Sequence, residues 1–144
     1  MLNSRIISVA ASFGMALVGS PAMAERLPRQ VPVTLSRGVS SSQIRGEIAG
    51  YEAVDYRVTA HAGQTMTVTF KPTSRFAFFN VLPPDSDVAL FVGATEGSRY
   101  QSVLPHDGEY VLRVYLTRNA ARRHEMARYA MAVSVVDPTP EHRN

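Results

Sequence analysis

The chain has 144 residues, no Cys, and 15 Lys and Arg against 12 Asp and Glu, which leaves a formal net charge of +3. The absence of Cys excludes disulfides, thiol catalysis, Cys-bound zinc and iron–sulfur clusters. The charge is too small to predict nucleic-acid binding by itself. The folded part of the chain must therefore derive its stability from its core alone.

The first 24 residues are typical of a cleaved secretory signal peptide. A short basic segment that ends at Arg5 precedes an apolar run, and Ala22 and Ala24 supply the small residues of an A-x-A cleavage site. The apolar run is shorter than the roughly 20 residues that a membrane-spanning helix needs, which argues against a membrane anchor. We expect a periplasmic protein in three parts: a signal peptide over 1–24, a single β-sandwich domain over 25–136 and a flexible tail over 137–144.

Apolar and polar residues alternate with a period of two along most of the remaining chain, which predicts β-strands. The predicted strands span 31–37, 43–49, 53–61, 64–71, 76–82, 87–92, 99–104, 109–116 and 128–136. The two strands on either side of Ala62-Gly63 are typical of a hairpin. Residues 119–127, with Asn119 as N-cap, are compatible with a single helical turn or two. Many short strands and almost no helix predict an all-β fold, an antiparallel β-sandwich or jelly roll.

The segment from Glu109 to Arg123 joins a strand to a cluster of cations. Tyr110, Leu112, Val114 and Leu116 share one parity, which predicts that this face of the strand is buried. The next residues include Arg118, Arg122 and Arg123, whose guanidinium groups could bind the carboxylates or phosphates of a partner. The alternative is a solvent-exposed face in which Arg122 pairs with Glu125. Tyr51 and Tyr115 could supply aromatic rings beside the cluster.

The sequence contains no catalytic or metal-binding motif. Its four His residues lack metal-ligand spacing, and the nucleophile elbow, the phosphate-binding glycine loop and the dinucleotide fingerprint are absent. Asp107, Gly108 and Tyr110 are typical of a structural turn that enters a strand. We therefore predict a protein that is not an enzyme, with no catalytic residues, no metal and no cofactor; a hydrolase with a site assembled across strands is the least favoured interpretation.

The Arg-rich segment and its strand also resemble a known family. The run Arg113-Val114-Tyr115-Leu116 followed by Arg118-Asn119-Ala120-Ala121-Arg122-Arg123 is similar to the PliG family, the periplasmic inhibitors of goose-type (g-type) lysozyme. Shorter matches at Gly50-Tyr51, Gly63-Gln64-Thr65, Phe78-Phe79-Asn80-Val81 and Leu104-Pro105 extend the resemblance over most of the chain after the signal peptide.

The resemblance implies a monomeric β-sandwich that plugs the active site of a g-type lysozyme or related muramidase, without a nucleic-acid partner. It assigns partner binding to Arg118, Arg122 and Tyr51, and we include Arg123 from the same Arg-rich segment. Asp107 stands where the Ser-Gly-x-Tyr motif of the family has Ser, and Thr117 stands where Met is expected. The alternative function is a non-catalytic module that binds a glycan or an anion directly.

Overall fold

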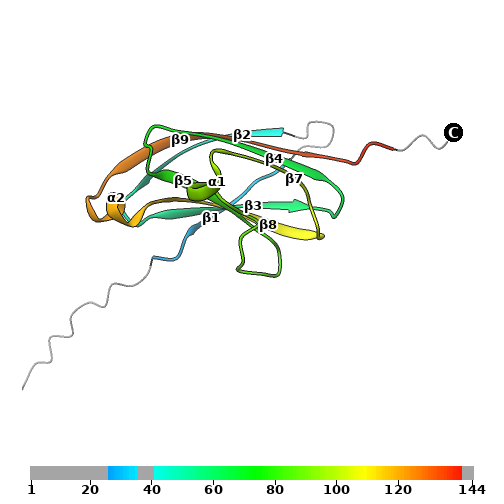
Figure 1. Ribbon diagram of the computed structural model, residues 1–144, viewed down its shortest axis with the longest axis horizontal. Coiled ribbons are helices and arrows are strands. Elements are labelled where there is room, and N and C mark those ends of the chain that lie inside the picture. The colour runs from blue at the N-terminus through cyan, green and yellow to red at the C-terminus, as the bar shows by residue number, and fades with distance from the viewer. Residues whose placement is uncertain (1–25, 36–40, 141–144) are drawn as a thin grey trace, which may run out of the picture.

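The computed structural model describes residues 26–35 and 41–140, which form two β-sheets packed face to face (Figure 1). Sheet A has the strand order β1-β3-β8-β5-β6, and sheet B has the order β2-β9-β4-β7. This architecture confirms the predicted all-β sandwich. The predicted signal peptide and the last four residues of the predicted tail lie outside the described residues.

The strands are short, and two brief helices interrupt them. Sheet A consists of β1 (Arg29–Pro32), β3 (Ala53–Ala60), β5 (Ala77–Leu82), β6 (Phe91–Val92) and β8 (Gly108–Leu116). Sheet B consists of β2 (Ser41–Ala49), β4 (Thr65–Pro72), β7 (Arg99–Val103) and β9 (Met126–Val136). The helices are α1 (Gly93–Glu96) and α2 (Arg118–Arg122).

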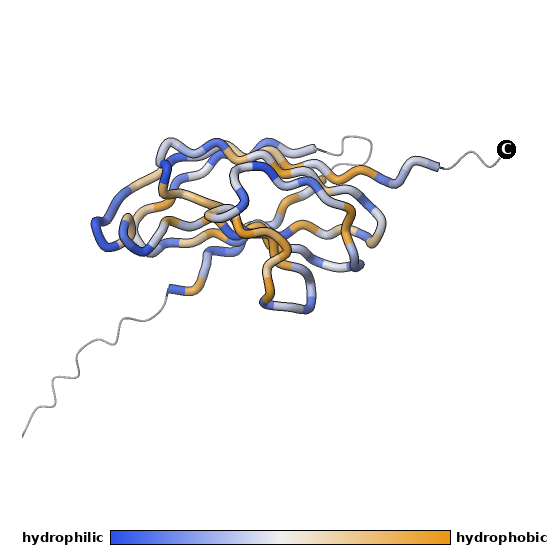
Figure 2. Tube along the Cα trace, viewed as in Figure 1, coloured by the Kyte–Doolittle hydropathy of each residue, from blue (hydrophilic) through white to orange (hydrophobic). Residues whose placement is uncertain are grey.

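The core lies between the two sheets and is filled by one parity of each strand. On β8 the inward side chains are Tyr110, Leu112, Val114 and Leu116, and all four are buried, as the alternation predicts. Buried and less buried side chains alternate in the same way along β4, β5 and β9, and hydrophobic residues recur along the strands of both sheets (Figure 2). Burying an aliphatic or aromatic side chain contributes roughly 1.5–3 kcal/mol, so this alternation is what holds the sheets together.

The predicted hairpin around Ala62-Gly63 is wrong, although the turn itself forms. β3 pairs with β1 and β8 in sheet A, whereas β4 pairs with β7 and β9 in sheet B. The turn, in which Gly63 has a φ of 88°, therefore carries the chain from one sheet to the other. Both strands must bury one face in either arrangement, so their alternation does not distinguish a hairpin from a crossing between sheets.

Four further features of the fold differ from the predictions. The expected strand over 87–92 is only Phe91–Val92, because the residues before it form an exposed loop in which Val88 faces solvent. The segment between the predicted strands 87–92 and 99–104 contains the one-turn helix α1. The N-cap of helix α2 is Thr117, two residues before the predicted Asn119, and its side chain makes no capping hydrogen bond. The helix ends at Arg122 and does not extend to residue 127, because Met126 already begins β9. The first strand is parallel to β3 and covers 29–32.

The central strand β8 connects two opposite ends of the sandwich. It lies between β3 and β5, and its nine residues run from the turn at Gly108 to the start of α2. At about 3.4 Å per residue the strand separates these two features by about 27 Å. The Arg-rich segment and the Asp107–Tyr110 turn therefore lie at opposite ends of the molecule (Figure 1).

Candidate partner-binding site

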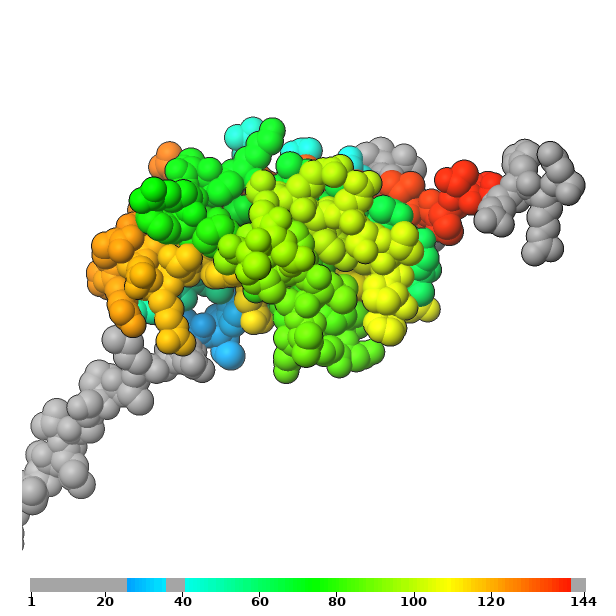
Figure 3. Space-filling model, in the orientation of Figure 1, coloured from blue at the N-terminus to red at the C-terminus, as the bar shows by residue number. Residues whose placement is uncertain are grey.

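Helix α2 presents two arginines on its outer side. Ala120 and Ala121 are buried against the sandwich, so the opposite side of the helix faces solvent. Arg118 and Arg122 are four residues apart, which places them one helical turn apart on that exposed side. Together with the connection to β9, the helix forms one end of the molecule, shown in orange in Figure 3.

The C-terminus of α2 is closed by a Schellman motif. The His124 N–H donates to the Ala121 carbonyl at 3.0 Å, and the Glu125 N–H donates to the Ala120 carbonyl at 3.1 Å. His124 has a φ of 54°, the left-handed conformation that this motif requires and that Gly usually supplies. This closure fixes the direction in which the chain leaves the helix and enters β9.

The turn that carries Tyr51 packs on this connection. The Gly50 N–H donates to the Glu125 carbonyl at 2.9 Å, and the Glu52 side chain accepts the Ala49 N–H at 3.1 Å. Gly50 has a φ of 58°, and the Glu52 N–H closes the turn on the Ala49 carbonyl. The structure thus brings Tyr51, which is 54% exposed, to the same end as Arg118 and Arg122.

The three arginines of the cluster differ in their partners. Arg123 donates from Nε to Glu125 Oε1 at 2.8 Å, and its guanidinium lies 5.4 Å from the centre of the Phe76 ring. Among the described residues, no carboxylate lies within 4.0 Å of the Arg118 or Arg122 guanidinium. The ion pair expected in the alternative interpretation therefore exists, but Arg123 rather than Arg122 forms it.

Sequence reasoning missed one exposed apolar residue at this end. Met126 opens β9 opposite Ala49 and is 57% exposed, a position that the predicted start of this strand at residue 128 concealed. Tyr115 is half-buried on the outer face of sheet A, opposite Ala53 in the β3–β8 register, and its hydroxyl donates to Asn80 Oδ1 at 3.0 Å. The exposed surface thus combines two guanidinium groups that have no carboxylate partner in the described part of the chain with an aromatic and a thioether side chain, a mixture common in protein interfaces.

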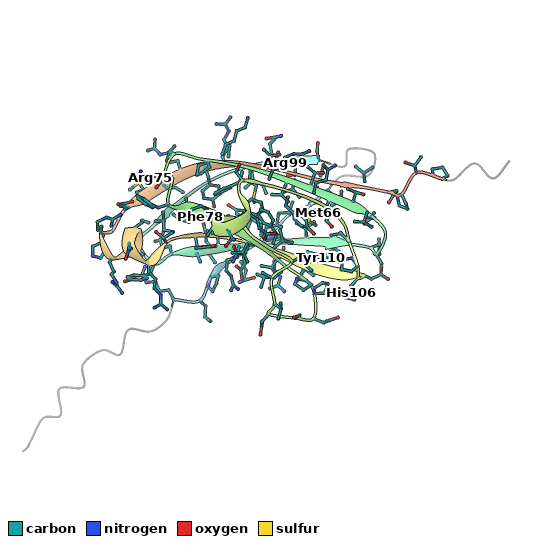
Figure 4. The ribbon with its side chains drawn as sticks, viewed as in Figure 1. Met66, Arg75, Phe78, Arg99, His106 and Tyr110 are labelled. Atoms are coloured by element: carbon teal, nitrogen blue, oxygen red, sulfur yellow. The ribbon has the colours of Figure 1, made fainter. Side chains whose placement is uncertain are left out.

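The turn at the start of β8 is stabilised by side-chain hydrogen bonds. The Tyr110 hydroxyl, buried at the other end of the sandwich from α2, donates to the His106 carbonyl at 2.7 Å and accepts its N–H at 3.1 Å (Figure 4). Asp107 Oδ1 accepts the Ala62 N–H at 2.7 Å, and Gly108 has a φ of 136°. These contacts tie the loop before β8 to itself and to the β3–β4 turn.

The outer face of sheet A carries a nearly buried ion pair. Asp55, which is 4% exposed, lies opposite Arg113 in the β3–β8 register and accepts its Nε and Nη2 at 2.7 and 2.9 Å. The hydrogen bond from Arg113 to the Asp55 carboxylate raises the pKa of the guanidinium. Gln30 also donates to Asp55, at 3.2 Å, so the pair fastens β1 to the sheet.

A shallow hollow adjoins this pair but lacks the features of a sugar site. It is lined by Leu82, Pro83, Pro84, Asp85, Ser86, Asp87, Val111 and Arg113. None of these residues is aromatic, so the hollow has no ring on which a sugar could stack. In the part of the chain that the structure describes, no three His, Cys, Asp or Glu residues are grouped to hold a metal ion. No helix within residues 26–35 and 41–140 is long and apolar enough to span a membrane.

Comparison with known proteins places the chain in a family. It is 32% identical over 108 residues to the inhibitor of g-type lysozyme from Escherichia coli K12, a match that covers 74% of this chain and 81% of that protein. The crystal structure of Aeromonas hydrophila PliG, a periplasmic inhibitor of g-type lysozyme, matches with a TM-score of 0.68 and 37% identity over 74% of this chain and 96% of that one.

Salmonella Typhimurium PliG, a periplasmic inhibitor of the same enzyme, matches with a TM-score of 0.61 and 27% identity over 76% of this chain and 99% of that one. No protein-family model matches the chain. The chain belongs to the PliG family of g-type lysozyme inhibitors, which confirms the resemblance carried by its Arg-rich segment.

Proposed function

We propose that the protein is a periplasmic inhibitor of g-type lysozyme that occupies the active-site cleft with Arg118, Arg122 and Tyr51. Its family supports the target and the compartment, since the relatives are inhibitors of this enzyme and are not themselves enzymes. The observation that carries the site is the pair of arginines on α2, which are exposed, one helical turn apart and without a carboxylate partner among the described residues.

The chemistry of the target fits this pair. Glycoside hydrolases hold carboxyl groups in their clefts, which protonate the leaving oxygen or act as nucleophile or base. A guanidinium that enters such a cleft pairs with a carboxylate, loses its water and can anchor the interface. Arg is better suited than Lys because its planar fork meets two oxygens at once. Tyr51 and Met126 add apolar contact beside the charges.

The rigidity of the site favours tight binding. Arg118 and Arg122 project from a helix whose buried side rests on the core, and the Tyr51 turn is hydrogen-bonded to Glu125 in the motif that closes that helix. A site that is already ordered before binding loses less conformational entropy when the complex forms. The inhibitor can therefore act as a preformed plug.

Replacing Arg122 tests the site directly. We expect Arg122→Ala to weaken inhibition of g-type lysozyme by about 2 kcal/mol, roughly 30-fold, because a carboxylate in the closed cleft loses its partner. Arg122→Lys should restore only part of the loss, since it keeps the charge but not the fork. Both variants should melt near the parent temperature because an exposed, unpaired Arg adds little stability.

The matched control is Arg99→Ala on β7, an exposed arginine outside the proposed site that has no ion-pair partner among the described residues (Figure 4). It should inhibit as the parent does. Equal inhibition by Arg118→Ala, Arg122→Ala and the parent would exclude this site. Binding of the protein to isolated peptidoglycan in the absence of lysozyme would instead favour the glycan-binding alternative.

A further inference from the structure

The third arginine of the cluster is already engaged within the molecule. Arg123 Nε and Nη2 both approach Glu125 Oε1, at 2.8 and 2.7 Å. The same guanidinium lies over the ring of Phe76, whose carbonyl accepts the Thr117 N–H at 3.0 Å. Arg123 thus contacts both Phe76, which precedes β5, and Glu125, which precedes β9.

Glu125 connects this contact to the two elements of the proposed site. Its N–H closes the C-terminus of α2 on Ala120, and its carbonyl holds the Gly50 N–H at the start of the Tyr51 turn. The side chain of Glu125 is bound only by Arg123 among the described residues. Any movement of Glu125 therefore affects both the direction of the helix and the position of the turn.

We propose that Arg123 and Glu125 form an intramolecular clamp that positions Arg122 and Tyr51 for lysozyme, and that Arg123 does not contact the enzyme itself. The inhibition measurements that test this proposal rest on the proposed function, whereas the amide-exchange measurement does not. The proposal assigns the three arginines of one segment to two roles. Arg118 and Arg122, which have no carboxylate partner within the described residues, bind lysozyme, and the paired Arg123 is a positioning residue.

The sign of one substitution separates this clamp from direct binding. If Arg123 bound an acidic cleft, Glu125 would compete for its guanidinium and add a negative charge near the cleft, so Glu125→Gln would strengthen inhibition. If the pair is a clamp, Glu125→Gln weakens inhibition instead. An exposed ion pair couples by at most about 1 kcal/mol, so we expect a loss of up to about fivefold.

The double variant gives the second measurement. Arg123→Ala should lower inhibition by a similar factor. The double variant Arg123→Ala/Glu125→Gln should inhibit at least as well as the single variant with the poorer inhibition, because the two side chains act as one unit. The control pair is Arg128 and Glu47, which form a cross-strand ion pair of the same kind at 2.9 Å between β9 and β2. Arg128→Ala and Glu47→Gln should leave inhibition unchanged.

Amide exchange of Gly50 tests the clamp without lysozyme. Its N–H is held by the Glu125 carbonyl, so Arg123→Ala, Glu125→Gln and the double variant should each exchange this proton several-fold faster than the parent. The Arg128 and Glu47 variants should exchange it at the parent rate. A parent that fails to inhibit lysozyme would refute the proposed function while this measurement still tests the clamp. Inhibition by Glu125→Gln that equals or exceeds that of the parent, or unchanged Gly50 exchange, would overturn the proposal.

Discussion

The core contains a hydrogen bond between the hydroxyl groups of two buried tyrosines. The hydroxyls of Tyr56 on β3 and Tyr129 on β9 lie 2.6 Å apart, and the side chains are only 3% and 4% exposed. Each hydroxyl is the other's partner among the described residues, and the rings meet edge to face with centroids 6.3 Å apart. The pair therefore links sheet A to sheet B inside an apolar environment.

Removing one hydroxyl should cost more than removing both. Tyr129→Phe leaves the Tyr56 hydroxyl buried without a partner, which costs about 1–3 kcal/mol of unfolding free energy, and Tyr56→Phe leaves Tyr129 in the same state. The ring of Tyr129 packs directly against Gly46, so closely that an added Cβ on Gly46 would overlap it. The ring therefore has no room to shift toward this strand. In the double variant both polar groups are gone and the shape is kept, so the cost should fall to about 1 kcal/mol or less.

Urea denaturation of the parent, both single variants and the double variant provides the measurement, with an unchanged m-value as the check that the unfolded states are comparable. Tyr51→Phe is the control, since Tyr51 is exposed and should stay within about 0.5 kcal/mol of the parent. Costs that simply add in the double variant would show that the two hydroxyls do not satisfy each other, and the reasoning would be wrong.

Two other predictions concern the far turn and the response to alkali. Asp107→Ala removes the acceptor of the Ala62 N–H and should lower the unfolding free energy by about 1 kcal/mol at most. Lysozyme inhibition should not change, because the turn lies at the opposite end from α2. Weaker inhibition without a loss of stability would contradict this prediction. Burial raises the pKa of Tyr129 above its ordinary value, so above about pH 10 the unfolded chain releases this proton and the folded chain keeps it. The stability that Tyr129 contributes should therefore be fully present below about pH 10 and fall at higher pH, by up to about 1.4 kcal/mol per pH unit. When the unfolding free energy is measured from about pH 8 to about 11.5, it should fall less steeply in Tyr129→Phe than in the parent.

Local patterns were sufficient to predict which side chains face the core. The alternation on β8 identified Tyr110, Leu112, Val114 and Leu116 as buried, because a strand turns successive side chains to opposite faces whatever its neighbours are. The same local reasoning located the turn at Gly63 and a short helical segment after β8. It erred at Val88 and Leu90, whose alternation resembles a strand but belongs to an exposed loop.

The partner-binding end shows the limit of local patterns. The sequence by itself determined the fold class, the buried parity of the strands and the segment that carries Arg118, Arg122 and Arg123. Only the tertiary structure decided that β3 and β4 lie in different sheets, that Tyr51 reaches the end of α2, and that Arg123 rather than Arg122 pairs with Glu125. Periodicity records how a side chain is oriented on its own strand, whereas strand partners and ion pairs depend on distances between segments that meet only when the sheets pack.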